Sequence, residues 1–180
     1  MIKTIVILFY NVLRIGFYKL KYGKRYNVHY IQRISPSCNL QVFQQGKLNI
    51  GRNTEIASGC DFQVHGQGEL IIGERTYFNR YCMISAHQSV KIGANCMFGP
   101  SVKIFDNNHR FTKEDGVSSA LKTDEIVIGN NCWIASNVII LKGTHIGDNC
   151  VIGAGCIVSG NIPSCSLVKC KTELEISEIH

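Results

Sequence analysis

The N-terminal part of the chain lacks acidic residues: residues 1–54 contain no Asp or Glu, although they carry nine Lys or Arg. Residues 55–180 hold ten basic residues against 13 acidic ones, a net charge of −3. The formal charge of +6 on the 180-residue chain therefore resides in its N-terminal segment. A nucleic-acid partner would favour a basic face with interleaved aromatic residues along the whole body, so the charge pattern argues against one.

The chain also lacks an uninterrupted apolar run of membrane-spanning length. The run over residues 5–10 is far shorter than the roughly 20 residues that a transmembrane helix needs, and no small-residue cleavage site follows it. The segment 1–33, apolar first and basic afterwards, predicts a short helical element. Either residues 1–25 lie on an anionic membrane surface, or this helix packs on its own body or on a neighbouring subunit. The expected location is the cytoplasm, with the inner membrane face as the site of any membrane contact.

Disulfide and zinc signatures are missing as well. The cysteine count is nine, an odd number, and no two cysteines form a CxxC pair. Without a secretory signal, these features oppose disulfides and structural zinc, so we expect free thiols and no bound metal.

What the chain does have is an apolar residue at every sixth position. Neither the helical period of 3.6 nor strand alternation produces this spacing. The repeat positions are Ile50, Ile56, Phe62, Ile72, Phe78, Ile84, Ile92, Phe98, Ile104, Ile128, Ile134, Ile140, Ile146, Ile152 and Val158, and Ile34 and Leu40 extend them toward the N-terminus. Each unit predicts a short strand and a turn, and three units predict one triangular coil of about 18 residues.

Two other positions of the repeat carry a recurring residue type. A glycine follows many of the repeat isoleucines, and an asparagine often stands two residues later, at Asn53, Asn95, Asn131 and Asn149. Both residue types tolerate positive φ and tight corners. The fourth position after the apolar residue holds Cys38, Cys60, Cys82, Cys96, Cys132, Cys150 and Cys156, or Thr and Val elsewhere. This pattern predicts small, buried side chains, a role that free cysteine fills.

The six-residue spacing breaks in three places, where we expect extra residues to leave the coil. The gaps run from Phe62 to Ile72, from Ile84 to Ile92 and from Ile104 to Ile128. The last is 24 residues long and predicts a projecting loop at about 105–125. It overlaps the stretch "SVKIFDNNHRFTKEDG", residues 101–116, which brings an aspartate, two asparagines, a histidine and an arginine together.

This repeat resembles the hexapeptide-repeat acyltransferases over about residues 34–162. The resemblance implies an all-β fold, a left-handed parallel β-helix that assembles as a homotrimer. The run "IVIGNNCWIASNVIILKGTHIGDNCVIGAGCIVSGNIP", residues 126–163, is similar to the coenzyme A end of the maltose and galactoside O-acetyltransferase branch. It implies an active site at a subunit interface. The expected organisation is a segment 1–33, the β-helical domain 34–162 and a tail 163–180.

The resemblance assigns coenzyme positions to four residues of this run. Trp133 and Ser136 match positions near the pantetheine arm and thiol, and Ala154 and Ser159 match positions that bind the arm. The family's usual Gly-x-Pro-Ala segment is replaced here by "SLVKCKTELEI", a departure that leaves the adenine contacts unassigned.

The same resemblance places His109 at the position of the catalytic histidine. A base of this kind removes the acceptor's hydroxyl proton as the oxygen attacks the thioester. Its orienting partner could be Asp106, Asp124, Glu125 or a backbone carbonyl. Asn79 matches an acceptor-facing asparagine that could also stabilise the oxyanion. Asn108 and His87 complete the expected acceptor contacts; His87 stands where the family carries an acidic residue.

The predicted function is acetyl-CoA-dependent transfer of acetyl to a sugar hydroxyl, directly within a ternary complex. The apolar and basic N-terminus favours a capsule or O-antigen glycan, or its lipid-linked precursor, as the acceptor. Two alternatives remain: a zinc lyase resembling the β-helical carbonic anhydrases, in which His87 and His109 would be ligands, and a non-catalytic β-helical subunit.

Overall fold

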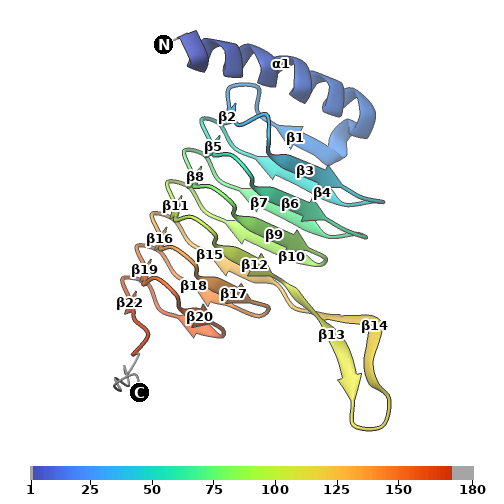
Figure 1. The fold of residues 1–180 in the computed structure, drawn as a ribbon, viewed down its shortest axis with the longest axis vertical. Coiled ribbons are helices and arrows are strands. Elements are labelled where there is room, and N and C mark those ends of the chain that lie inside the picture. The colour runs from blue at the N-terminus through green and yellow to red at the C-terminus, as the bar shows by residue number, and fades with distance from the viewer. Residues whose placement is uncertain (1, 172–180) are drawn as a thin grey trace, which may run out of the picture.

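The structure, a computed structural model, describes residues 2–171, and residues 172–180 of the expected tail lie outside the described residues. The chain begins with helix α1 (Ile2–Tyr22) and a 3₁₀ turn, η1 (Gly23–Arg25), and then winds into a parallel β-helix of about six coils. Figure 1 shows α1 lying across the N-terminal end of the coil stack, with the last strand at the opposite end.

Three parallel sheets form the sides of the coil, and each coil contributes one strand to each sheet. The first sheet contains β1 (Tyr26–Val28), β4 (Lys47–Ile50), β7 (Glu69–Ile72), β10 (Ser89–Ile92), β15 (Ile126–Ile128), β18 (His145–Ile146) and β21 (Asn161–Ile162). The second contains β2 (Arg33–Ile34), β5 (Glu55–Ile56), β8 (Tyr77–Phe78), β11 (Met97–Phe98), β16 (Trp133–Ile134), β19 (Val151–Ile152) and β22 (Leu167–Val168). The third contains β3 (Asn39–Val42), β6 (Asp61–Val64), β9 (Met83–Ala86), β12 (Lys103–Phe105), β17 (Ile139–Leu141) and β20 (Ile157–Val158).

The six-residue pattern correctly predicted the core. The repeat positions from residue 34 to residue 158 point inward, are at most 6% exposed and stack on their counterparts in the next coil. The rings of Phe78 and Phe98 form one such stack in the second sheet, with centroids 4.4 Å apart, and the ring of Phe62 from the third sheet meets Phe78 edge-on at 4.9 Å. Stacking identical side chains removes every coil interior from water, and this burial stabilises a fold with very little helix.

The asparagines and glycines of the turns have different roles. Asn53, Asn95 and Asn131 have φ between 57° and 58°, as expected of residues that turn a corner. The glycines after the repeat isoleucines do not need positive φ; they allow close approach between coils. A Cβ on Gly73 would lie 2.5 Å from the backbone nitrogen of Ala94.

The cysteines at the fourth position are buried and free, as predicted. Six of them, all except Cys156, are also more than small hydrophobic residues, because their thiols donate to a carbonyl near a corner. The thiol of Cys96 lies 3.1 Å from the carbonyl oxygen of Gly129, and the Thr76 hydroxyl lies 3.0 Å from that of Gly93. The fourth position of the repeat can hold either cysteine or threonine because both side chains are small and can donate a hydrogen bond.

Cys96→Thr should therefore change the free energy of unfolding by less than about 1 kcal/mol, whereas Cys96→Ala should lower it by about 2 kcal/mol. Alanine leaves the Gly129 carbonyl without its donor and opens a small cavity. Urea denaturation of the two variants provides the measurement. Equal stabilities of the two variants would contradict a stabilising role of the hydrogen bond to the Gly129 carbonyl.

Helix α1 covers the first coil with one of its faces. Ile15 on this face is 1% exposed, and the buried Asn11 amide donates to the carbonyl of Ile34 at 2.8 Å. The Arg14 guanidinium donates to the carbonyls of Ser35 and Cys38. These carbonyls belong to the first coil, so the helix supplies side-chain donors where no preceding coil exists. The alternative that the N-terminal helix packs on its own body is thus confirmed for this face.

Within residues 2–171, no helix is sufficiently long and apolar to cross a bilayer.

The coil differs from the predicted layout in two respects. Strand pairing begins at Tyr26 and ends at Val168, beyond both predicted limits of 34 and 162. The first two breaks in spacing do not project. Longer strands such as β6 and β7 absorb the extra residues, because each has four residues and the corner between them is short. Only the third break leaves the coil.

Candidate active site

The third break folds into a hairpin rather than an irregular loop. Strands β13 (Asn107–Thr112) and β14 (Gly116–Thr123) pair antiparallel, and their register shifts between His109 and Phe111. Figure 1 shows this hairpin projecting from the side of the coil, beyond β12. The hairpin gives His109 a regular backbone support outside the packed body.

His109 is exposed on β13, and its Nδ1 atom lies 2.9 Å from the Ser118 carbonyl oxygen across the hairpin. A carbonyl only accepts hydrogen bonds, so Nδ1 carries a proton in this contact. In the neutral ring, Nε2 is then unprotonated and can accept a proton. The sequence offered a carboxylate or a backbone carbonyl as the orienting group, and in the structure it is the carbonyl.

A cavity of about 560 Å³ lies beside this imidazole. Its other lining residues are Asn108, Arg110, Phe111, Thr112, Lys122 and Lys142. Three of them are cationic and none is acidic, so the cavity favours an anionic ligand. Lys142 comes from the coil and the others from the hairpin, so the cavity lies where the two meet.

Asp106 does not orient His109, contrary to one of the sequence-based alternatives. Its side chain is fully buried and accepts backbone hydrogen bonds from His87, Gln88 and Ser89 at 2.7–3.0 Å. It also accepts one from the Asn107 amide at 3.1 Å. Asp106 occupies the inward position that Val64 and Ala86 hold in the preceding coils. The carboxylate thereby fastens the start of the hairpin to the corner below it.

The two other acidic residues that the sequence offered as orienting groups, Asp124 and Glu125, also contact other parts of the molecule. Glu125 forms a salt bridge with Lys91 at 3.2 Å and lies 4.0 Å from His145. The Asp124 backbone N–H donates to the Asp106 carbonyl at 2.9 Å, which closes the base of the hairpin. The contacts of both residues fix the ends of the hairpin and do not involve His109.

His87 lies at the same corner of the coil as Asp106 and belongs to a column of stacked rings. The rings of Phe43, His65 and His87 are separated by 4.7 and 4.5 Å and are nearly parallel. Burial, followed by the charge of His87, lowers the pKa of His65. Sequence reasoning gave His65 no role. The sequence feature that could have predicted this column of rings is the 22-residue spacing of positions 43, 65 and 87.

The remaining predicted residues lie elsewhere on the coil. Asn79 and Ser136 occupy the corner between the second and third sheets, and the exposed Ala154 occupies the same corner in a later coil. The Asn79 side chain accepts from the Arg80 backbone N–H at 2.8 Å. Trp133 stands on the outer face of β16 and is 50% exposed. Ser159 is exposed after β20, at the corner shared with His87 and the hairpin.

One chain therefore separates the predicted site residues into two groups. His87, Asn108, His109 and Ser159 belong to the corner between the third and first sheets. Asn79, Trp133, Ser136 and Ala154 belong to the second sheet and its corner with the third. The strands of the third sheet lie between the two groups.

Comparisons with known proteins show which family model and which named proteins the sequence resembles. The family model "Bacterial transferase hexapeptide (six repeats)" matches residues 125–160. The putative lipopolysaccharide biosynthesis O-acetyl transferase WbbJ of Escherichia coli is 35% identical over 99 residues, covering 50% of each chain. The galactoside O-acetyltransferase of the same organism is 39% identical over 93 residues, covering 50% of this chain and 46% of its own. The chain thus spans about half the length of the curated relatives it matches.

Among solved structures, AntD, an N-acyltransferase from Bacillus cereus in complex with dTDP and 3-hydroxybutyryl-CoA, has a TM-score of 0.68 at 15% identity. The match covers 84% of this chain and 81% of AntD, and at this identity it establishes the fold alone. The chain is a parallel β-helix whose residues 125–160 match the hexapeptide-repeat family model, and about half of it is similar in sequence to proteins named O-acetyltransferases.

Proposed function

We propose that the protein is an acetyl-CoA-dependent O-acetyltransferase that acts on a sugar hydroxyl, with His109 as the general base. The observation that carries the proposal is the hydrogen bond between His109 Nδ1 and the Ser118 carbonyl. It holds the ring in one tautomer and leaves Nε2 able to take a proton beside a cavity large enough for a sugar.

The reaction is a direct transfer within a ternary complex. The acceptor hydroxyl gives its proton to His109 Nε2 as its oxygen forms a bond to the acetyl carbonyl carbon. The tetrahedral intermediate then breaks its C–S bond, and the imidazolium returns the proton to the departing coenzyme A thiolate. Asn79 is proposed to hold the acceptor or donate to the oxyanion, and Asn108 and His87 to contact the acceptor.

The coenzyme is proposed to lie along the corner that carries Ser136 and Ala154, beside Trp133. Small residues keep this corner narrow: a Cβ on Gly99 would lie 2.6 Å from the Ser136 backbone nitrogen. A corner lined by small residues, with the exposed indole of Trp133 beside it, suits an extended pantetheine arm. The acyl-CoA thioester in the AntD complex shows that this fold accommodates such a donor.

The separation of the two groups of residues supports a site shared between chains. A sheet lies between the Asn79 corner and the hairpin corner within one chain, so a neighbouring chain must bring its own corner to complete the site. We therefore propose a homotrimer, with each site built from the hairpin of one subunit and the coenzyme corner of the next.

A surface glycan or its precursor is the proposed acceptor, and the cytoplasm the proposed place of reaction. The name of the first relative, which refers to lipopolysaccharide biosynthesis, supports this acceptor class. The three cations of the cavity would suit an acidic sugar or the coenzyme phosphates. Within the described residues of one chain, no group of three His, Cys, Asp or Glu could hold a metal ion.

The decisive test is release of coenzyme A from acetyl-CoA in the presence of free, nucleotide-linked and lipid-linked sugars. We expect release to require a sugar, and isothermal titration to show acetyl-CoA binding that Trp133→Ala weakens about tenfold. The exposed Ile157→Ala variant, on the third sheet, is the matched control. Failure to bind acetyl-CoA would refute the proposal.

A further inference from the structure

The outer face of α1 is apolar from Ile5 to Leu20. Its exposed side chains are Ile5, Val6, Phe9, Val12, Leu13, Phe17 and Leu20. Leu20 is 88% exposed and Phe9 is 67% exposed, whereas the opposite face packs on the first coil. Rotating the helix would bury these residues only by exposing Ile15 and breaking the hydrogen bonds of Asn11. The apolar face is therefore a fixed surface of the molecule.

At the C-terminal end of α1, one lysine lies on each side of this outer face. At 100° per residue, Lys19 and Lys21 fall about 100° to either side of its centre. Lys24 and Arg25 follow directly in η1. Because residues 1–54 contain no acidic residue, no carboxylate of this segment neutralises the cations. An apolar face between basic margins is typical of helices that lie in the plane of a bilayer.

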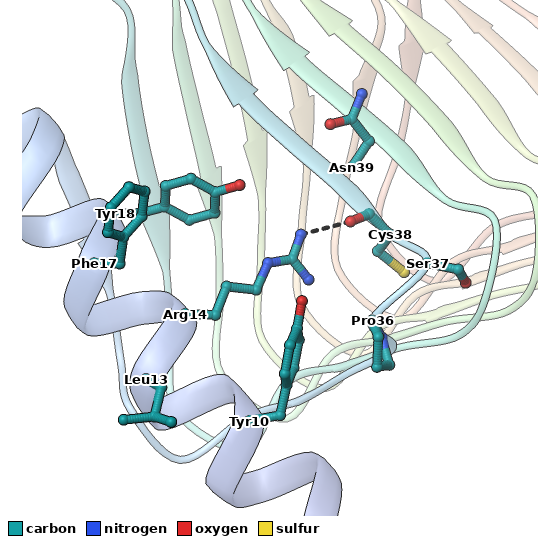
Figure 2. A pocket seen from close by; sticks show the side chains of 9 residues that line it. All are labelled: Tyr10, Leu13, Arg14, Phe17, Tyr18, Pro36, Ser37, Cys38 and Asn39. Carbon is teal, nitrogen blue, oxygen red and sulfur yellow. Dashed lines mark hydrogen bonds between the residues drawn. The ribbon is translucent and has the colours of Figure 1, made fainter.

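A pocket of about 590 Å³ opens beside the same face, between α1 and the corner at residues 36–39. Its walls include Tyr10, Leu13 and Phe17, and the Arg14 guanidinium lies in its middle (Figure 2). Arg14 is held by two backbone carbonyls and forms no salt bridge with a carboxylate of the described residues. A fixed cation between aromatic and apolar walls suits a phosphate whose hydrocarbon part continues into an apolar phase.

We infer that α1 docks the N-terminal end of the coil on a bilayer containing anionic phospholipids, and that the Arg14 pocket takes a lipid phosphate. Figure 1 shows that α1 lies at the end of the coil stack, so this docking leaves the sides of the coil and the hairpin in water. A second copy of the chain would fit less well. Packing two outer faces together would bring two sets of basic margins into contact without an acidic partner from residues 1–54.

This inference does not depend on the acetyltransferase activity, because vesicle binding needs neither substrate. The experiment is flotation of the full-length protein with phosphatidylcholine vesicles, with and without one-third phosphatidylglycerol. We expect binding to the anionic vesicles to be at least about tenfold stronger, and to fall in 0.5 M salt. Phe9→Glu with Leu20→Glu should reduce it by about tenfold or more, since both charges would enter the apolar interface.

Two further variants separate the pocket from a general charge effect. Ser37→Glu places a carboxylate beside Arg14 at an exposed position and should lower the preference for anionic lipid severalfold. Val117→Glu introduces the same charge at a 72% exposed position of the hairpin and should leave binding unchanged. Thermal unfolding and molar mass in solution are measured for each variant.

Equal binding of wild type and the Phe9→Glu, Leu20→Glu variant to anionic vesicles would overturn the inference. So would absence of vesicle binding together with a lower molar mass of that variant, because the outer face would then be covered by another copy. An equal effect of Ser37→Glu and Val117→Glu would overturn the assignment of a lipid phosphate to the pocket.

Discussion

Replacing His109 with alanine should lower kcat/KM for acetyl transfer by about 10²- to 10⁴-fold. The imidazole is the group whose Nε2 can accept the hydroxyl proton, since Nδ1 is committed to the Ser118 carbonyl at 2.9 Å. Alanine leaves that carbonyl on an exposed hairpin, where water can replace the ring, so the fold should be unaffected. Initial rates of coenzyme A release at several acceptor concentrations give the effect.

The pattern of the loss distinguishes catalysis from binding. We expect kcat to fall while the dissociation constant of acetyl-CoA, measured by titration, stays within about threefold of wild type, because the proposed role of the imidazole is to take the acceptor's proton and not to bind the coenzyme. His145→Ala removes another exposed histidine, on β18, and serves as the matched control. A His109→Ala enzyme as fast as this control would exclude His109 as the base.

The second large effect is expected at Asp106, on stability rather than on proton transfer. Asp106→Ala should lower the free energy of unfolding by about 3 kcal/mol, since it removes the fully buried carboxylate that accepts from three partly buried backbone N–H groups at residues 87–89. Urea denaturation followed by circular dichroism provides the measurement.

A conservative replacement and a control variant test whether the Asp106 carboxylate is responsible for this loss of stability. Asp106→Asn keeps one acceptor oxygen and should lose about half as much stability. Asp124→Ala removes an exposed carboxylate two residues from the coil and should change stability by less than about 1 kcal/mol. If Asp106→Ala were as stable as Asp124→Ala, the carboxylate would not be what fastens the hairpin to the coil.

The sequence predicted the coil well because the six-residue period reports directly on burial. An inward row of Ile, Phe and Val can be counted without knowing any contact, and its burial is now confirmed from Ile34 to Val158. The hairpin was less predictable. Residues 107–112 are mostly exposed, so no apolar alternation revealed that they form a strand. The limits of the coil were missed although Val28 lies six residues before Ile34 and Val168 lies six residues after Ile162, so the same spacing could have been followed further at both ends.

The prediction that Asp106 could orient His109 was wrong for a physical reason. A carboxylate near a candidate base suggests an orienting partner, but its position relative to Ile104 placed it on the inward face of the coil. There it can only serve buried N–H groups. Counting inward and outward positions through residue 106 would have predicted this. The partner that His109 has, a backbone carbonyl on the opposite strand, depends on hairpin register and carries no residue signature.

The hydrogen bonds from Asn11 and Arg14 to the first coil also bear on how the molecule avoids polymerising. A coil of parallel strands ends in rows of unpaired backbone groups, and each end can template the end of another molecule. By occupying the first coil, α1 makes one of the two ends unable to elongate. Removing α1 would open that end, and the shortened chains could then join head to tail into fibres.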